Sequence, residues 1–173
     1  MILPHINEIA SLCAAHGVTQ SVASPGSRSA AISLAFENHP EIDVKVVADE
    51  RSAAFIALGM AQQKQQAVAL ICTSGSAVYN YAPAVAEAFY QEIPLLIITA
   101  DRPPEWTNQY DGQTIQQEDI FGKHVKSSFI LPVDLSHPDA QWHSNRMVNE
   151  AILLTASAAK GPVHLNVPIR EPF

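Results

Sequence analysis

The sequence predicts an α/β fold: a doubly wound, mainly parallel six-stranded sheet with helices on both faces. Apolar runs of strand length alternate with segments of helical periodicity along the 173 residues, which is the pattern of successive βαβ units. The runs AVALICT at 67–73 and LLIITA at 95–100 have no polar alternation, as expected for strands buried on both faces. Apolar residues make up 47% of the chain and charged residues 16%. This balance predicts one compact domain over residues 1–173.

The first half of the chain is predicted to supply three strands and the helices that follow them. An opening helix that ends near His16 is indicated by the helical spacing of Ile2, Ile6, Ile9 and Cys13, with Gly17 after it. Pro83 should kink a later helix, because proline lacks the N–H and crowds the preceding turn. Strands are expected at 20–24, 44–48 and 67–73, and helices at 30–38, from 50 onward and from 76 towards 91.

The second half is predicted to supply three more strands around a long polar connection. The connection at 105–118 is expected to be functional, since long ordered loops usually are, and a short helix is expected at 115–121. Strands are expected at 95–100, 128–131 and 163–167. A helix is expected at 139–159, with Trp142, Val148, Ala151, Ile152 and Thr155 facing inward.

Composition and charge argue against several classes of function. The net charge of −7 repels phosphate backbones and acidic lipids, so we expect no nucleic-acid partner and no membrane insertion. Cys13 and Cys72 lie in apolar runs without a C-x-x-C partner, which predicts reduced core residues and a cytoplasmic location. The seven histidines show no metal-ligand spacing, and no dinucleotide or phosphate-loop glycine motif is present. We therefore expect no metal site among these residues.

Four unusual motifs stand where predicted strands end. They are SPGSRS at 24–29, ADERS at 48–52, TSGSA at 73–77 and ADRPPE at 100–105. Parallel strands place their carboxyl ends at one edge of the sheet, and doubly wound sheets bind ligands at that edge. The sequence therefore predicts one ligand site built from these four segments.

Glu50 is the candidate catalytic residue of this site. A carboxylate between a buried strand and the alanine-rich helix after it is poorly solvated, which suits proton exchange near neutral pH. The residues alone leave a structural alternative open, in which Asp49 is the helix N-cap and Glu50 a first-turn anion. The convergence of four motifs on one edge favours the catalytic interpretation.

Two arginines are candidate ligands for carboxylates. Arg28 lies beside a predicted helix N-terminus, where N–H groups and a guanidinium could both face an anion; a surface turn is the alternative. Arg102, which two prolines follow, is a second possible ligand for a carboxylate. The alternative is an exposed loop arginine. Gly75 would let a ligand ring approach the backbone, while Ser76 could simply cap the next helix.

In their order and separation, the four motifs resemble the N-terminal, pyrimidine-binding domain of a thiamine diphosphate enzyme family. This family is the 2-succinyl-5-enolpyruvyl-6-hydroxy-3-cyclohexene-1-carboxylate (SEPHCHC) synthases of menaquinone biosynthesis. The resemblance covers essentially the whole chain, and ADRPPE with SPGSRS separates it from acetolactate synthases. It implies a transferase that decarboxylates 2-oxoglutarate and adds the succinyl group to isochorismate. Another thiamine-dependent carboligase or a stand-alone ligand-binding module is the alternative.

The resemblance also implies roles for individual residues. Glu50 matches the glutamate that hydrogen-bonds the aminopyrimidine ring of thiamine diphosphate and promotes the imino tautomer. Gly112 stands where well-known members carry an asparagine. The cofactor-binding residues implied are Glu50, Thr73, Ser74, Gly75 and Ser76, and the substrate-binding residues implied are Ser27, Arg28, Arg102 and Gln113.

Half of the family's active site has no counterpart in these residues. In the family, a C-terminal domain with a Gly-Asp-Gly motif holds the diphosphate and Mg²⁺, and this sequence contains no such motif. The resemblance therefore implies a fragment of a longer enzyme, inactive by itself, that self-associates as a dimer or a dimer of dimers. Small residues after Glu50 could serve such a contact or pack tightly on the sheet; they are Ala53, Ala54, Ala57, Gly59 and Ala61.

Overall fold

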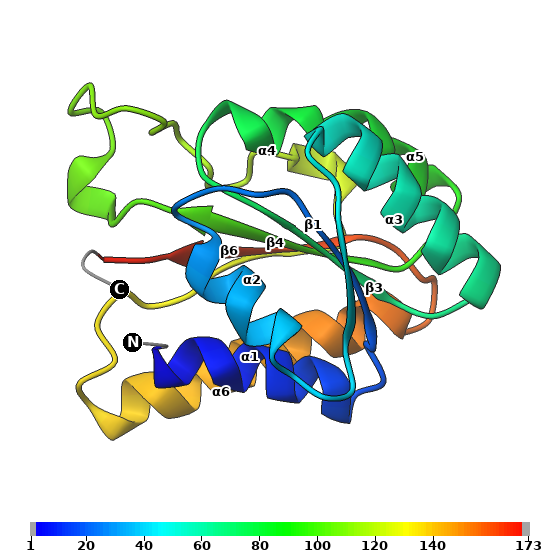
Figure 1. Cartoon of the computed structure of the whole chain (residues 1–173), viewed down its shortest axis with the longest axis horizontal. Helices are drawn as coiled ribbons and strands as arrows, with labels where there is room; N and C mark the ends of the chain where they lie inside the picture. Colours follow the sequence, from blue (N-terminus) through cyan, green and yellow to red (C-terminus); the bar gives the residue numbers. More distant parts are fainter. Residues whose placement is uncertain (1–2, 171–173) are drawn as a thin grey trace.

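The computed structural model describes residues 3–170, which form one six-stranded sheet with every pair of neighbouring strands parallel (Figure 1). The strand order is β2-β1-β3-β4-β6-β5. The strands are β1 (Gln20–Ala23), β2 (Asp43–Val46), β3 (Val68–Cys72), β4 (Leu95–Asp101), β5 (Ser128–Ile130) and β6 (Val163–Pro168). The predicted fold class is confirmed, and each predicted strand is present near its expected bounds.

Helices cover both faces of the sheet, as a doubly wound fold requires. Helices α1, α2 and α6 lie on one face, and α3, α4 and α5 lie on the other (Figure 1). The helices are α1 (Pro4–Ala15), α2 (Ala30–Glu37), α3 (Glu50–Lys64), α4 (Ser76–Asn80), α5 (Ala82–Tyr90) and α6 (Pro138–Ala156), with 3-10 turns η1 (Pro104–Trp106) and η2 (Gly122–His124).

The central strands serve two cores at once. Every residue of β3 and β4 is buried, and successive side chains of a strand point to opposite faces. Ile71 therefore packs with α1, α2 and α6, whereas Leu70 packs with α3, α4 and α5. Both cysteines are buried and free, and burial raises the pKa of the Cys13 thiol to about 12. The prediction that they are core residues is confirmed.

Helix α1 ends as its sequence predicts. Ile6, Ile9 and Cys13 are buried on its inner side, while Ile2 lies outside the described residues. His16 is the C-cap residue, and Gly17 follows with φ of +80°. This left-handed conformation is open to glycine without steric cost, so Gly17 turns the chain towards β1.

The helix predicted from 76 towards 91 is divided into α4 and α5 at Tyr81. Pro83 lies in the first turn of α5, where the missing N–H leaves no helical hydrogen bond unmade. Tyr81 is fully buried, and its hydroxyl donates to the Ile71 carbonyl oxygen at 2.7 Å. The break thus attaches this helix pair to the end of β3.

Two expectations for the second half of the chain are wrong. Trp142 is 65% exposed on α6, because it lies about 120° around the helix from Val148; the other four residues expected to face inward are buried. The segment 115–121 forms turns and no helix. Asp119 has φ of +50°, which a right-handed helix does not accept.

The strand before Glu50 is also not the buried strand that was expected. β2 is at one edge of the sheet, and Val46 is 67% exposed. A short apolar run does not by itself distinguish an edge strand from a central one. The small residues of α3 pack on the sheet, since four of them are buried while Gly59 is exposed; the buried ones are Ala53, Ala54, Ala57 and Ala61.

Candidate functional site

The four predicted motifs meet at one edge of the sheet. β2, β1, β3 and β4 are consecutive neighbours, so the segments that follow them lie side by side. The strand order reverses between β1 and β3, which is where doubly wound sheets form their ligand crevice. Gly26 after β1 touches Thr73 after β3, and an added Cβ at Gly26 would be 2.3 Å from the Thr73 Cβ. Two of the motifs therefore pack directly on each other at the switch point.

Glu50 lies at this edge in the first turn of α3, where its negative charge also suits the helix N-terminus. Asp49 caps α3, with its Oδ1 accepting a hydrogen bond from the Ser52 N–H at 2.8 Å. Glu50 is the first residue of α3 and is partly buried, and within residues 3–170 no hydrogen bond or ion pair holds its carboxylate. Burial raises the pKa of the Cys72 thiol, and the nearby negative charge of Glu50 adds to this. The carboxylate is therefore close to the end of β3.

Arg28 is a buried residue, which contradicts the surface-turn alternative. Its side chain is 5% exposed, and Nη1 donates to the Ile169 carbonyl oxygen at 2.9 Å. Ile169 follows β6, so Arg28 joins the end of β1 to the end of a strand that is not its neighbour in the sheet. Ser27 beside it is exposed.

The turn after β3 is covered by the long loop between β4 and β5, residues 102–127. Gly75 has φ of +85°, and a Cβ added to it would lie 2.9 Å from the Gln113 carbonyl oxygen. The Gln113 backbone thus occupies the space beside Gly75 that the sequence suggested for a ligand ring. Gly75 is itself the N-cap residue of α4, and no side chain caps this helix. Capping therefore does not account for Ser76, which is exposed.

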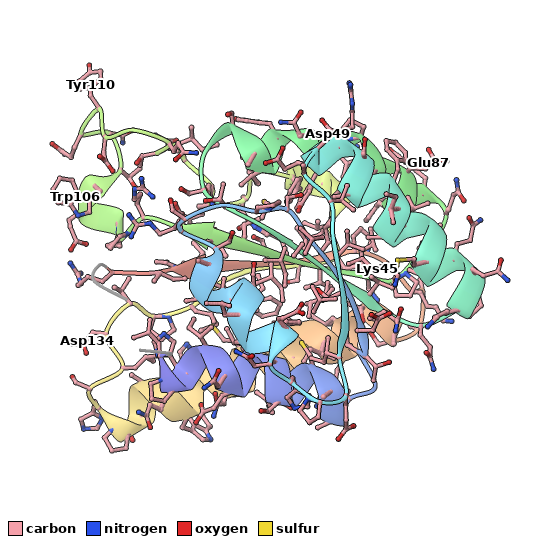
Figure 2. The ribbon with its side chains drawn as sticks, viewed as in Figure 1. Lys45, Asp49, Glu87, Trp106, Tyr110 and Asp134 are labelled. Atoms are coloured by element: carbon pink, nitrogen blue, oxygen red, sulfur yellow. The ribbon has the colours of Figure 1, made fainter. Side chains whose placement is uncertain are left out.

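This loop carries strained backbone. Four of its residues have positive φ without being glycine: Asn108, Tyr110, Gln113 and Asp119. Such conformations are costly and persist where the surrounding structure enforces them. Trp106 and Tyr110 project with the loop past the end of the sheet (Figure 2).

Gln117 anchors the loop to the sheet. Its side chain is 1% exposed, and its Oε1 accepts a hydrogen bond from the Gly75 N–H at 2.8 Å. Its Nε2 donates to the Ala100 carbonyl oxygen at 3.1 Å and to Asn166 Oδ1 at 2.9 Å. One buried amide therefore joins the loop, the turn after β3 and two strands.

A chain of buried polar groups continues from this amide into the sheet. Asn166 Nδ2 donates to Asp101 Oδ2 at 2.8 Å, and the Thr99 hydroxyl donates to Asn166 Oδ1 at 2.7 Å. His164 Nε2 is 2.8 Å from Thr99 Oγ1. Burial lowers the pKa of His164 to about 3, and it raises the pKa of the Asp101 carboxyl against the opposing hydrogen bond from Asn166. His164 is thus a core histidine whose two ring nitrogens both have hydrogen-bond partners.

Arg102 is bound by the loop and is not an exposed loop arginine. Its Nε donates to Asp111 Oδ2 at 2.9 Å, its Nη1 to Ser74 Oγ at 3.2 Å and its Nη2 to the Gly112 carbonyl oxygen at 3.0 Å. The hydrogen bond from Arg102 lowers the pKa of Asp111. The Asp111 carboxylate therefore already binds the Arg102 guanidinium, which the sequence assigns to a substrate carboxylate.

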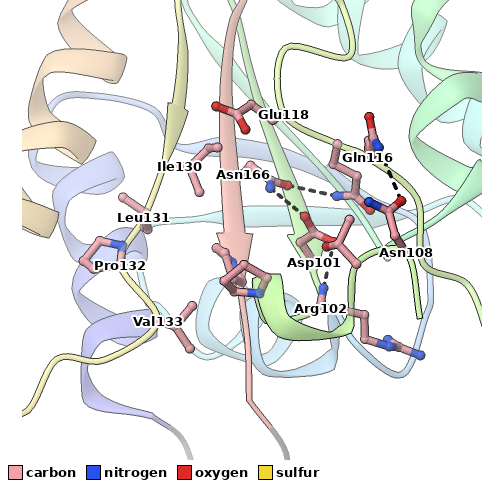
Figure 3. Close-up of a pocket in the computed structure, with 14 residues that line it drawn as sticks. Asp101, Arg102, Asn108, Gln116, Glu118, Ile130, Leu131, Pro132, Val133 and Asn166 are labelled. Atoms are coloured by element: carbon pink, nitrogen blue, oxygen red, sulfur yellow. Dashed lines mark hydrogen bonds between the residues drawn. The ribbon is translucent and has the colours of Figure 1, made fainter. Parts of the chain in front are cut away.

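Two cavities open beside these groups. The smaller, of about 430 Å³, is lined by Arg28, Arg102, Pro103, Trp106, Asp111 and Arg170. The larger, of about 600 Å³, lies between the loop and the segment after β5 (Figure 3). Its polar side includes Asp101, Asn108, Gln116 and Asn166, and its apolar side includes Ile130, Leu131, Pro132 and Val133.

Sequence reasoning did not identify Asp111, Gln117, Asn166 or Arg170 as site residues. Asn166 carried a usable signal, because a polar residue within an otherwise apolar strand must find a buried partner. Gln117 carried none, since it stands in a polar loop among other polar residues. Arg170 joins the site only because β6 lies next to β4.

Two further properties concern residues 3–170 alone. No helix in this part of the chain is both long and apolar enough to span a membrane. Within the same residues, no group of three or more His, Cys, Asp or Glu side chains is placed to hold a metal ion.

The chain is similar to a family of known proteins and to several individual members. The family described as thiamine pyrophosphate enzyme, N-terminal TPP binding domain, matches residues 7–125. A 2-succinyl-5-enolpyruvyl-6-hydroxy-3-cyclohexene-1-carboxylate synthase of Cytophaga hutchinsonii is 56% identical over 97% of this chain and 30% of its own length. The enzymes of the same name from Phocaeicola vulgatus and Bacteroides fragilis are 49% and 46% identical, each over 98% of this chain and 30% of their own length.

Proposed function

This chain belongs to the thiamine pyrophosphate enzyme family, and we propose that it forms the pyrimidine-binding half of the active site of a SEPHCHC synthase. The observation that carries the proposal is the Glu50 carboxylate, which lies at the sheet edge shared by four motifs without a partner in residues 3–170. The chain spans 30% of the length of the relatives that it matches. The proposed reaction therefore needs residues beyond this domain.

The residues present fit thiamine diphosphate, the cofactor of the family. When bound, the cofactor supplies the carbon nucleophile for decarboxylating a 2-oxo acid and transferring the remaining fragment. Glu50 would hydrogen-bond a pyrimidine ring nitrogen through a carboxyl oxygen and hold the proton there, a role that needs a carboxylate with no competing donor. Thr73, Ser74 and Ser76 would line the pyrimidine, and Gly75 keeps the covering loop in place beside them.

The two substrate-binding arginines support a carboxylated substrate. Guanidinium groups bind carboxylates through paired hydrogen bonds, and Arg28 and Arg102 line the same cavity. We propose 2-oxoglutarate and isochorismate as the substrates, with Ser27 and Gln113 at the edge of the site. Mg²⁺ and the diphosphate would be held by another domain, in a cytoplasmic enzyme that is a dimer or a dimer of dimers.

The test replaces Glu50 by Gln in the full-length protein, with Glu87→Gln as the control. Glu87 is an exposed acid on α5 (Figure 2). We expect Glu50→Gln to lower product formation from 2-oxoglutarate and isochorismate by about 10²–10⁴-fold, the usual contribution of a proton-transfer group. The Glu87→Gln variant should match the parent. Near-parental turnover of Glu50→Gln would disprove the role of Glu50.

A further inference from the structure

We infer that Arg170 is a further substrate-binding residue, which completes a cavity of three arginines and binds a carboxylate of the substrate beside Arg28 and Arg102. The inference rests on the proposed function for the identity of the substrate. It rests on the structure for the site, since the three guanidinium groups line one cavity of about 430 Å³.

The fold brings the three arginines together through a single residue, Ile169. The Ile169 N–H donates to the Asp101 carbonyl oxygen at 3.0 Å, which places the end of β6 next to Arg102. The Ile169 carbonyl oxygen accepts from Arg28 Nη1 at 2.9 Å. Because Ile169 is itself buried, the backbone that precedes Arg170 is held on both sides. These two hydrogen bonds of Ile169 at the end of β6 therefore fix the backbone position of Arg170 beside the cavity.

The concentration of positive charge in this cavity is unusual for the chain. The sequence has five arginines and a net charge of −7, yet three of the five arginines line this cavity. Guanidinium groups bind carboxylates through paired hydrogen bonds, so a cavity lined by several of them suits a carboxylate ligand. Trp106 adds a flat apolar wall to the same cavity, which suits a carboxylate carried on an organic ring or chain.

Two acids of the covering loop already show how carboxylates bind in this place. Asp111 accepts from Arg102 Nε, and Glu105 pairs with Arg170 Nη1. The side chains of Arg170 and Glu105 are 56% and 50% exposed, and exposed ion pairs of this kind contribute little to stability. Such a pair exchanges readily, so Glu105 can give way to a substrate carboxylate at Arg170.

The main alternative is that Arg170 only fixes the start of the loop by pairing with Glu105. The two explanations predict opposite effects for Glu105→Gln. If Glu105 competes with the substrate for Arg170, its neutralisation lowers KM. If the ion pair itself is what matters, Glu105→Gln raises KM as much as Arg170→Gln does.

The experiment compares the full-length parent with Arg170→Gln and Glu105→Gln, and uses Arg146→Gln as the matched control. Arg146 is an exposed arginine on α6 that pairs with Glu150. KM is measured for 2-oxoglutarate and for isochorismate separately, each with the other saturating, which shows the substrate whose carboxylate Arg170 binds. We expect Arg170→Gln to raise one of these KM values about tenfold, the effect of one lost charge-assisted hydrogen bond. Arg146→Gln should leave both unchanged, and Glu105→Gln should lower the same KM.

Unchanged KM values in Arg170→Gln, or equal increases in Arg170→Gln and Glu105→Gln, would overturn the inference. An inactive parent would count against the proposed function alone. Calorimetric titration of the same proteins with isochorismate and with 2-oxoglutarate then decides the role of Arg170. There we expect the parent to bind at least one of them and Arg170→Gln to bind it about tenfold more weakly. Equal affinities of the parent and Arg170→Gln, or no binding of either substrate by the parent, would refute the substrate-binding role of Arg170.

Discussion

The Gly75 N–H and the Gln117 side-chain oxygen are joined by a buried 2.8 Å hydrogen bond across 42 residues of sequence. The same amide donates to the Ala100 carbonyl oxygen and to Asn166. Because the amide both accepts and donates, only a residue with both capacities satisfies all three neighbours. This relationship determines where the long loop lies over the candidate site.

Gln117→Ala should destabilise the protein by about 2–4 kcal/mol, because it leaves buried donors and acceptors without partners. Gln116→Ala is the matched control, since Gln116 is the exposed neighbour of Gln117 in the same loop. Urea unfolding of both variants gives the difference in free energy. Equal stability of the two variants would mean that Gln117 does not anchor the loop.

Gly75→Ala should destabilise the protein by about 1–3 kcal/mol, because the position combines a left-handed backbone with a close contact. A Cβ there would lie 2.9 Å from the Gln113 carbonyl oxygen. Gly59→Ala on α3 is the control, where no atom lies within 4 Å of an added Cβ. That change should stabilise by about 0.5–1 kcal/mol, since alanine favours a helix over glycine. Thermal unfolding shows whether Gly75→Ala lowers the stability of the protein and Gly59→Ala raises it.

His164 should make the protein less stable as the pH falls from about 6.5 towards 3. Burial lowers the pKa of the folded-state imidazole from 6.5 to about 3, so within this window the unfolded chain binds a proton that the folded chain does not. Protonation then favours unfolding by up to about 1.4 kcal/mol per pH unit. Above pH 6.5 both states are neutral and this contribution to stability is fully present.

The measurement is urea unfolding of the parent and of His164→Gln at several pH values between 4 and 7. The variant loses this titrating group, so the difference in unfolding free energy between parent and variant should shrink with falling pH. A difference that stays constant over the range would show that His164 does not titrate in this way.

The chain of residues 1–173 should bind thiamine diphosphate with Mg²⁺ weakly or not at all in a calorimetric titration. The reason is that the proposed ligands of the diphosphate lie on another domain, and the contacts here reach only the pyrimidine. The full-length protein, titrated under the same conditions, is the positive control. Tight binding by the 173-residue chain would mean that the cofactor site is complete within this domain.

Local patterns in the sequence were sufficient for most of the fold. Uninterrupted apolar runs identified β3 and β4 as central strands, because a strand covered on both faces has no polar side. The end of α1 followed from Gly17, and the ends of four strands followed from the four motifs. The parallel arrangement then placed Glu50, Arg28, Ser74 and Arg102 at one edge, since parallel strands share their carboxyl ends.

The order of the strands in the sheet decided what the local patterns could not. β2 is an edge strand and β6 lies between β4 and β5, and no apolar run encodes which neighbour it pairs with. For that reason Gln117, Asn166 and Arg170 joined the site only in the folded chain. The shape of the long loop was equally beyond the sequence, because its course depends on buried hydrogen bonds between residues far apart in the chain.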